Sequence, residues 1–213
     1  MNIYNLCIKN YSNIIFDCDG VILDSNKIKE NNISKVGSNY LHGEILESFL
    51  TFFNDNPGLP REIKIDRFID DGKIKSKLLH DYKKMNLDAL KNANLSDGLL
   101  HFLNDELHRN IPKFIVSGGD QSELLEVMKY KGLSKYFTKI LGGPKSKYEN
   151  INTLNINGNT LYFGDSKIDY EVCEFYDFDF VFVSDYTEKD ISFNKNSKIK
   201  TYQICNLYNL NLK

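Results

Sequence analysis

Short apolar runs alternate along most of this chain with segments whose apolar residues recur every three or four positions. Short buried runs predict β-strands, and the longer repeat predicts amphipathic helices. The predicted strands lie at 13–17, 113–116, 139–141, 160–163 and 178–183, with a last one within 199–205. The accompanying helices are expected at 98–109, 120–131, 147–155 and 168–176. This alternation predicts an α/β fold in which a parallel sheet carries helices on both faces.

The segment between the first two predicted strands differs, because it shows a helical pattern throughout and no confident strand. Helices are expected there at 26–36, 40–53, 60–70 and 72–85. Helices of this length can pack into a small bundle of their own. The pattern therefore predicts two parts, a core and a helical insertion that begins at 26 and extends at least to 88. Ahead of the first strand, residues 3–8 form either an edge strand or a loose lead-in.

The composition is that of an ordinary globular protein, with 41% hydrophobic residues, 26% charged residues and a net charge of −2 over 213 residues. Without a strongly basic block, nucleic acid is not the expected partner. No apolar run approaches the roughly 20 residues that a membrane-spanning helix needs, and residues 1–10 lack a signal-peptide pattern. The cysteines form no CxxC pair, so we predict reduced thiols and a cytoplasmic location.

Polar side chains follow four of the predicted strands at the points where these strands end. Asp17 and Asp19 come directly after the first strand, where burying a carboxylate is costly unless it is paired or binds a metal. The other strand ends carry Ser117-Gly118, Lys145 with Lys147, and Asp165 with Asp169. Because the carboxyl ends of parallel strands meet at one edge, these groups are expected to lie close together. Carboxylates, an anion cradle and an ammonium favour Mg²⁺ binding and phosphoryl chemistry.

Each of these groups also has a purely structural interpretation. The first pair of acids could occupy a solvated turn, the last pair and Ser117 could cap helices, and a lysine could lie on an exposed helix face. The functional interpretation is favoured because four strand ends agree. Cys18, between the first two acids, is expected to pack, since neighbouring carboxylates disfavour a thiolate. The histidines, His108 among them, lie away from the strand ends and are expected at the surface.

Four motifs occur in order along the chain: DxDGxxxDS at 17–25, a serine ending the second core strand, a later lysine, and GDSxxD at 164–169. In this order they resemble the motifs of the haloacid dehalogenase superfamily, and the chain is similar to those phosphatases of the family that have a small helical cap of the C1 type. The resemblance implies a Rossmann-like core of 1–25 and 94–213 with an inserted α-helical cap domain at 26–93, which agrees with the helical insertion that the pattern predicts. It also implies that Asp24 and Ser25 lie at the hinge into the cap.

The resemblance further implies a role for each acid. Asp17 would be the nucleophile that forms an aspartyl-phosphate. Asp19 would protonate the leaving group and then activate water as a base. Mg²⁺ would be held by the carboxylates of Asp17 and Asp165 and by the backbone carbonyl of Asp19, while Asp169 would orient the ligands from behind.

Phosphate-binding groups follow from the same resemblance. The Ser117 hydroxyl and the Gly118 N–H would hold the transferring phosphoryl oxygens. Lys147 is expected to neutralise the developing charge, and Lys145 is the alternative.

The cap stretch GLPREIKIDRF at 58–68 resembles a pattern found in some relatives. Arg61 and Lys64 are three residues apart and share a helix face. Either they contact a phosphate or carboxylate of the substrate, or they form a solvated face.

The favoured function is that of a Mg²⁺-dependent phosphatase, which hydrolyses a small phosphate monoester through an aspartyl-phosphate. The expected partner is a small phosphorylated metabolite. The alternatives are a phosphomutase of the β-phosphoglucomutase type that acts on a sugar phosphate, a dehalogenase, and a binding module without activity. The presence of Asp19 and of the Asp165/Asp169 pair argues against the dehalogenase. The identity of the ester and the oligomeric state stay open.

Overall fold

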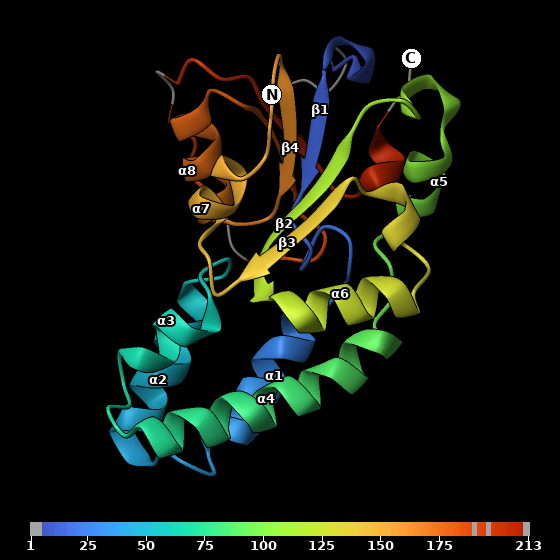
Figure 1. Ribbon diagram of the computed structural model, residues 1–213. Helices are drawn as coiled ribbons and strands as arrows, with labels where there is room; N and C mark the ends of the chain where they lie inside the picture. Colours follow the sequence, from blue (N-terminus) through green and yellow to red (C-terminus); the bar gives the residue numbers. More distant parts are fainter. Residues whose placement is uncertain (1–5, 189–190, 195–196, 211–213) are drawn as a thin grey trace.

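In the computed structural model, which describes residues 6–188, 191–194 and 197–210, six parallel strands form one sheet (Figure 1). They are β1 (Asn13–Phe16), β2 (Lys113–Asp120), β3 (Lys139–Gly143), β4 (Thr160–Gly164), β5 (Asp179–Val183) and β6 (Thr201–Ile204). The strand order is β3-β2-β1-β4-β5-β6, so the chain builds outward from β1 to β3 and then returns to the other side of β1. Such a reversal opens a crevice at the carboxyl ends of the strands, where ligands bind in sheets of this type.

Alternate residues of the central strands enter two separate apolar cores. Ile14 and Phe16 of β1 pack on one face of the sheet, whereas Ile15 packs on the other. In β4, Tyr162 belongs to the same core as Ile15, and its neighbours belong to the opposite one. Because successive side chains of a strand point to opposite faces, a sheet covered on both faces needs apolar residues at every position. This explains why the strands appear in the sequence as continuous apolar runs.

Two pairs of helices cover the two faces of the sheet (Figure 1). Helices α5 (Leu99–Asn104) and α6 (Gln121–Tyr130) contribute to the core that contains Phe16. Helices α7 (Lys147–Asn152) and α8 (Lys167–Tyr176) contribute to the core that contains Ile15. The predicted α/β fold with a Rossmann-like parallel sheet is therefore confirmed.

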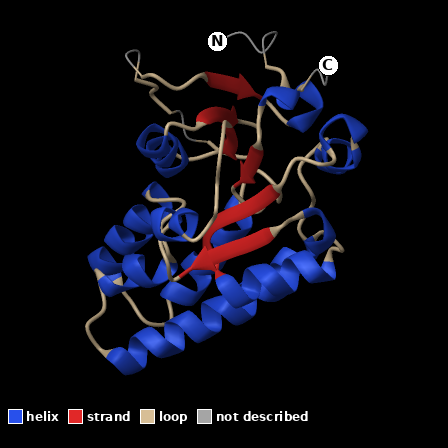
Figure 2. Ribbon diagram, turned by 45° about the horizontal axis from the view of Figure 1, so that its top comes forward, coloured by secondary structure: helices blue, strands red, loops and turns tan. Residues whose placement is uncertain are grey.

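The chain between β1 and β2 starts with four helices that form the predicted insertion (Figures 1 and 2). They are α1 (Asn26–Gly37), α2 (Gly43–Asp55), α3 (Arg61–Asp66) and α4 (Gly72–Asn92). These helices enclose an apolar core of their own, to which Phe49, Ile65 and Tyr82 belong. The insertion lies beyond the carboxyl ends of β2 and β3, and therefore faces the crevice (Figure 1).

The two chain segments that join the insertion to the sheet lie side by side. The Asp24 N–H donates to the carbonyl of Asn94 (3.1 Å), and the Ser96 N–H donates to the carbonyl of Ile22 (3.0 Å). We propose the division into a core of 1–25 and 94–213 and a cap of 26–93 on this basis, because few backbone connections then cross between the parts.

Helix α4 is longer than the predicted 72–85, because its buried stripe continues through a polar residue. Tyr82, Asn86 and Leu90 are all buried and lie four residues apart. Asn86 interrupts the apolar pattern in the sequence, but its side-chain oxygen accepts a hydrogen bond from Asn32 of α1 (2.8 Å). A buried amide that is hydrogen-bonded in this way can replace an apolar residue on a packed face.

The predicted helix 98–109 is interrupted. At Asp105 the backbone is extended, and the side chain accepts a hydrogen bond from the Leu107 N–H (2.7 Å), which starts a 3₁₀ turn at Glu106–His108. Aspartate competes with helical bonding in this way. The turn also buries His108, so the expectation that it lies at the surface is wrong.

At the amino-terminal end, Ile8–Asn10 forms a 3₁₀ turn rather than part of a strand, and residues 3–5 lie outside the described residues. Among the described residues, no helix has both the length and the apolar character that crossing a membrane requires.

Candidate active site

Asp17 is the residue directly after β1, which is an inner strand of the sheet. Its carboxylate is buried and accepts a hydrogen bond from the N–H of Cys18 (2.7 Å). The chain then turns sharply at Gly20, whose φ of 75° is in the left-handed region that favours glycine. A Cβ at Gly20 would collide with the carboxylate of Asp165, so the turn allows the ends of β1 and β4 to approach each other.

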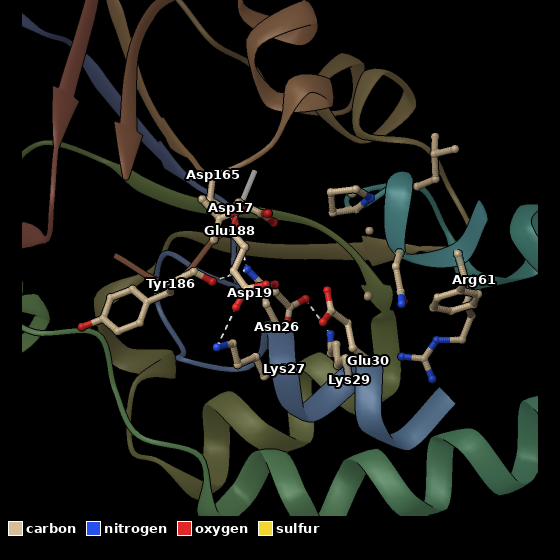
Figure 3. A pocket seen from close by; sticks show the side chains of 18 of the residues that line it. Asp17, Asp19, Asn26, Lys27, Lys29, Glu30, Arg61, Asp165, Tyr186 and Glu188 are labelled. Atoms are coloured by element: carbon tan, nitrogen blue, oxygen red, sulfur yellow. Dashed lines mark hydrogen bonds and ion pairs between the residues drawn. The ribbon is translucent and has the colours of Figure 1, made fainter. Parts of the chain in front are cut away.

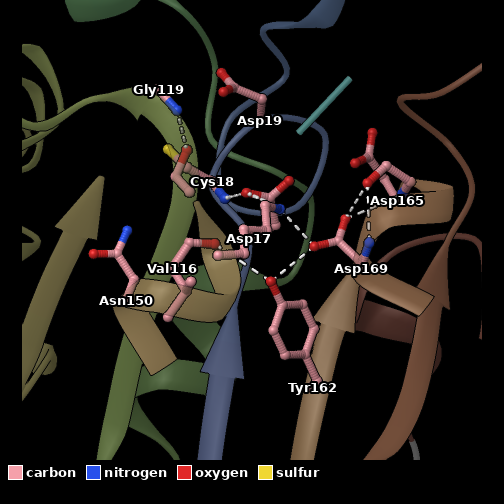
Figure 4. A network of polar contacts seen from close by, with 12 residues as sticks. Asp17, Cys18, Asp19, Val116, Gly119, Asn150, Tyr162, Asp165 and Asp169 are labelled. Carbon is pink, nitrogen blue, oxygen red and sulfur yellow. Dashed lines mark hydrogen bonds and ion pairs between the residues drawn. The ribbon is translucent and has the colours of Figure 1, made fainter. Parts of the chain in front are cut away.

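A cluster of buried carboxylates lies at this point of the sheet (Figure 4). Asp17, Asp165 and Asp169 each place an oxygen within 4.8 Å of the other two. Burial, followed by the charges of the neighbouring carboxylates, raises the pKa of Asp165 well above its ordinary value. The pKa of Asp17 is also raised, chiefly by burial and against the opposing charge of Lys147.

These carboxylates fit a hard divalent cation. The Lys147 ammonium is the one cation paired with the cluster among the described residues, so two charges would lack a positive partner when all three carboxylates are ionised. The raised pKa values of Asp17 and Asp165 reflect this excess of negative charge. A hard divalent cation bound by carboxylate oxygens, as Mg²⁺ is, would cancel this excess. Asp17 and Asp165 are the acids best placed to hold it, because the oxygens of Asp169 already have three other side-chain partners.

Asp169 is held by side chains from three different elements (Figure 4). One oxygen accepts hydrogen bonds from Lys147 Nζ (2.5 Å) and from the Tyr162 hydroxyl (2.7 Å). The other accepts from the Ser166 hydroxyl (2.5 Å) as part of the capping box that starts α8. Asp169 therefore fixes the position of Lys147 and of the first turn of α8.

Lys147 is the first residue of α7, and its side chain is fully buried. The ammonium lies 3.0 Å from Asp17 and 2.5 Å from Asp169. Burial alone would lower the pKa of Lys147, but the two carboxylates raise it above the ordinary value, so the side chain stays charged. Lys145, the alternative considered from the sequence, is exposed. The structure thus brings Lys147 to Asp17 and leaves Lys145 at the surface.

Asp19 lies on the side of the turn that faces the cap (Figure 3). It accepts hydrogen bonds from the Ser25 hydroxyl (2.6 Å) and from Lys29 Nζ of α1 (2.5 Å). Burial alone would raise the pKa of Asp19, but the Lys29 ammonium, the Ser25 hydroxyl and the charge of Arg61 act together against it, and the pKa is lowered. The two carboxylates of the DxD motif thus have different partners: Asp17 is bound to the core, and Asp19 is bound to the cap.

Ser117 and the two glycines after it lie in the last part of β2, at the same end of the sheet as Asp17. The strand continues to Asp120 with an irregular register, so the helix cap of α6 is Asp120 and not Ser117. The buried Ser117 hydroxyl accepts a hydrogen bond from the Gly119 N–H (3.0 Å). A Cβ at Gly118 would collide with the backbone of Gly58, so glycine at this position allows the cap loop to contact the sheet end.

A cavity of about 390 Å³ opens between the sheet ends and the insertion (Figure 3). The core contributes Asp17, Asp19, Gly118, Gly119 and Asp165 to its wall. The insertion contributes Asn26, Lys27, Lys29, Glu30, Phe53, Gly58, Arg61, Lys64 and Tyr82, among others. The cavity has the size of a small-molecule site. Six of the residues predicted from the sequence line it: Asp17, Asp19, Arg61, Lys64, Gly118 and Asp165. Ser117, Lys147 and Asp169 are buried and do not line it.

The two cap cations predicted from the sequence both line this cavity, and both have protein partners. The Arg61 guanidinium makes two hydrogen bonds to Glu123 of α6 (2.6 and 3.2 Å). Lys64 Nζ donates to the carbonyls of Phe53 (3.2 Å) and Asn56 (3.3 Å) at the end of α2.

Several residues of the site were not found by sequence reasoning. Asn26 donates to Asp165 (2.7 Å) and to the carbonyl of Tyr186 (2.8 Å), and it directly follows the DxDGxxxDS motif. Lys29, one helical turn after Ser25, could have been suspected from its closeness to that motif. Glu123 carried no signal, because it occurs in an ordinary amphipathic helix and its partner is 62 residues away.

The family model of the haloacid dehalogenase-like hydrolases matches residues 14–183. None of the curated proteins matches the chain. Among solved structures, a haloacid dehalogenase-like family hydrolase from Streptococcus pneumoniae is 16% identical, with a TM-score of 0.64 over 92% of this chain and 95% of that chain.

Two further structures share the fold. CbbY from Rhodobacter sphaeroides, solved in complex with phosphate, is 11% identical, with a TM-score of 0.71 over 94% of this chain and 96% of that chain. β-Phosphoglucomutase from Clostridium difficile is 16% identical, with a TM-score of 0.59 over 83% of this chain and 86% of that chain. The family match extends from β1 to β5 and includes every strand end described above, so the chain belongs to the haloacid dehalogenase-like hydrolases.

Proposed function

We propose that this protein is a Mg²⁺-dependent phosphatase that hydrolyses a small-molecule phosphate monoester through an aspartyl-phosphate on Asp17. The observation that carries the proposal is the position of Asp17. Its carboxylate lies at the wall of the cavity, 3.0 Å from a buried ammonium and within a cluster of buried acids. A nucleophilic carboxylate next to groups that neutralise phosphoryl oxygens supports phosphoryl transfer to Asp17.

Asp19 is ionised in the free protein, because its pKa is lowered, and it first takes up the proton of an ester that binds as its monoanion. In the first step, an Asp17 oxygen attacks phosphorus, the bond from phosphorus to the ester oxygen breaks, and Asp19 gives this proton to the leaving alkoxide. In the second step, Asp19 takes a proton from water, and the water oxygen attacks phosphorus. Inorganic phosphate leaves, and Asp17 is again a free carboxylate. General acid and base catalysis of this kind contributes about 10²–10⁴-fold to the rate.

Asp17, Asp165 and the backbone carbonyl of Asp19 would hold Mg²⁺, which supplies positive charge to the oxygens of the transferring phosphoryl group. Asp169 keeps Lys147 directed at Asp17, as its 2.5 Å contact to that ammonium supports. The Ser117 hydroxyl and the Gly118 N–H would bind phosphoryl oxygens at the end of β2. The substrate is a small phosphorylated metabolite, in accord with the size of the cavity.

The test is a phosphate-release screen over a panel of metabolite esters, run with Mg²⁺, with EDTA, and with EDTA followed by excess Mg²⁺. We expect release with Mg²⁺, none in EDTA, and recovery when Mg²⁺ is restored. Full activity in EDTA contradicts the metal role. If a phosphosugar is instead converted to an isomer without release of phosphate, the protein is a mutase and the proposal is wrong.

A further inference from the structure

The Arg61 guanidinium, at the start of α3, forms a buried ion pair across the boundary between cap and core. Two of its nitrogens bond to the two carboxylate oxygens of Glu123, at 2.6 and 3.2 Å. The side chain of Arg61 is 5% exposed and that of Glu123 is 2% exposed. The guanidinium carbon also lies 4.8 Å above the ring of Tyr82. Arg61 is therefore fixed by two residues of the protein on two sides.

A substrate anion could make the bidentate contact to the two terminal nitrogens of Arg61 only in place of Glu123. The exchange would leave the Glu123 carboxylate buried without its two hydrogen bonds, which is strongly unfavourable. A bidentate arginine–carboxylate pair is also among the stronger polar contacts in proteins. The protein thus already supplies the carboxylate that a substrate would otherwise provide.

The other cations in the cavity wall are likewise engaged. Lys29 pairs with Asp19 at 2.5 Å, and Lys27 pairs with Glu188 at 2.7 Å. Lys64 donates to two carbonyl groups at the end of α2. Within the described part of the wall, the four cationic side chains each contact a protein acceptor.

The wall also carries acids besides Asp17, Asp19 and Asp165, namely Asp24, Glu30 and Asp185, and Glu188, which is paired with Lys27. Acids on a cavity wall repel an anion that enters it. Both observations disfavour a substrate with a second negative group.

We propose that Glu123 is a specificity-determining residue that acts by positioning Arg61. This inference rests on the proposed function. Glu123 withholds the guanidinium from the substrate, so the preferred substrates are phosphate monoesters whose remaining part carries no second negative charge. This revises the expectation that Arg61 anchors a phosphate or carboxylate of the substrate.

The test uses two esters of nearly equal size, 2-hydroxyethyl phosphate and 2-phosphoglycolate, which differ in that the second carries a carboxylate. We expect kcat/KM of the unmodified protein to be at least about tenfold higher for the hydroxyethyl ester. Glu123→Gln should move the ratio of the two kcat/KM values at least about tenfold toward phosphoglycolate, because the amide no longer neutralises Arg61. A purely structural role would lower both values together and leave their ratio unchanged.

Glu126→Gln is the matched control, since Glu126 lies on the same helix and pairs with Lys91 of α4 outside the cavity. It should leave the ratio unchanged. Circular dichroism shows whether Glu123→Gln folds.

A second test removes the whole ion pair with the double substitution Arg61→Met and Glu123→Gln, which leaves no lone charge. Because Arg61 is withheld from the substrate in the unmodified protein, the double variant should keep the ratio of the two kcat/KM values. A selective loss of at least tenfold for phosphoglycolate overturns this inference and makes Arg61 an anion anchor. A preference of the unmodified protein for phosphoglycolate also overturns the inference, whereas the proposed function stands. Release of phosphate from neither ester and from no member of the wider panel overturns the proposed function, and this inference falls with it.

Discussion

The core side and the cap side of the cavity both bury charged groups, but the charges balance differently. On the core side, three carboxylates surround the single ammonium of Lys147. On the cap side, Lys29 is paired with Asp19 and Arg61 with Glu123, while the buried Lys64 ammonium is held by two backbone carbonyls. Burying an ion pair costs desolvation whether or not the charges balance. An excess of buried charge of one sign therefore indicates where another charged species binds. Buried charges that are paired indicate that the side chains hold one another in position.

The core side and the cap side of the cavity therefore have different roles. The unbalanced core side is suited to a cation and a phosphoryl group, and this chemistry is common to any phosphate monoester. The cap side joins α1 and α3 to the acids of the core, so under the proposed function it would control the position of Asp19 and the charge that the leaving group meets. Substitutions on the core side should therefore abolish the reaction, and substitutions on the cap side should alter its rate or selectivity.

The largest effect is expected for Asp17→Asn. The amide keeps the shape but cannot attack phosphorus, so kcat should fall to the background rate, by a factor on the order of 10⁶. The substitution also removes one buried negative charge, so the melting temperature should be unchanged or higher. Phosphate release and thermal unfolding measure the two effects. Asp88→Asn, at an exposed position of α4, is the control for both. Activity of Asp17→Asn near that of the unmodified protein would exclude Asp17 as the nucleophile.

Lys147→Met should produce the next largest effect. It removes the ammonium that is proposed to neutralise the phosphoryl oxygens, which is expected to lower kcat about 10²–10³-fold. It also leaves Asp17 and Asp169 without their buried counter-charge, so the free energy of unfolding should fall by about 3–5 kcal/mol in the absence of Mg²⁺. Urea unfolding with and without Mg²⁺ measures the loss. Lys145→Met should change neither quantity, and equal effects of the two substitutions would refute the assignment of Lys147.

How much of the fold and of the site could be predicted from the sequence depends on how far apart in the chain the interacting residues lie. The strands could be predicted because β1 and β4 are covered on both faces, and their apolar runs require no knowledge of partners. The placement of Asp17 and Asp165 at one sheet edge followed from topology, since parallel strands end on the same side. These parts of the site depend on regular geometry and on motifs that occupy short stretches of chain.

The cap side could not be predicted in the same way. Arg61 was recognised as a candidate, but its partner Glu123 belongs to a helix of the core, and no periodicity specifies which surface residue of a helix meets another segment. The extra length of α4 was missed for a related reason, because the pairing of Asn86 with Asn32 becomes visible only when α1 and α4 are packed. Side-chain pairs between distant segments are set by tertiary packing.

A moderate effect is expected for Lys29→Met on the cap side. Asp19 would lose a charge-assisted hydrogen bond, of a kind worth about 1.5–3 kcal/mol, and kcat should fall about tenfold to a hundredfold. KM should change little, because Lys29 acts on Asp19 rather than on the ester. Lys29→Arg should recover part of kcat. Lys27→Met is the control, since Lys27 is two residues away and pairs with Glu188 at the exposed rim. A rise in KM at constant kcat would instead make Lys29 a substrate-binding residue.

The smallest effect on activity is expected at His108, a buried group that belongs to neither side of the site. Its ring stacks on Phe102 at 4.2 Å, and within the described part of the chain neither ring nitrogen has a hydrogen-bond partner. Burial, aided by the charge of Lys113 and opposed by Asp105, lowers the pKa of His108 from 6.5 to about 4.

The sign of the resulting pH dependence follows from this lowered pKa. Between pH 6.5 and 4 the unfolded chain binds a proton at His108 that the folded chain does not, so stability falls as the pH falls through this range. From pH 7 to pH 5 this group should lower the free energy of unfolding by about 2 kcal/mol. In His108→Phe that part of the pH dependence should disappear, while phosphate release at pH 7 stays unchanged because the ring precedes the opposite, amino-terminal end of β2. Urea unfolding at both pH values measures the difference. Equal pH dependence in the two proteins would contradict the lowered pKa of His108. A loss of activity at pH 7 would show that packing at the amino-terminal end of the sheet also affects the site.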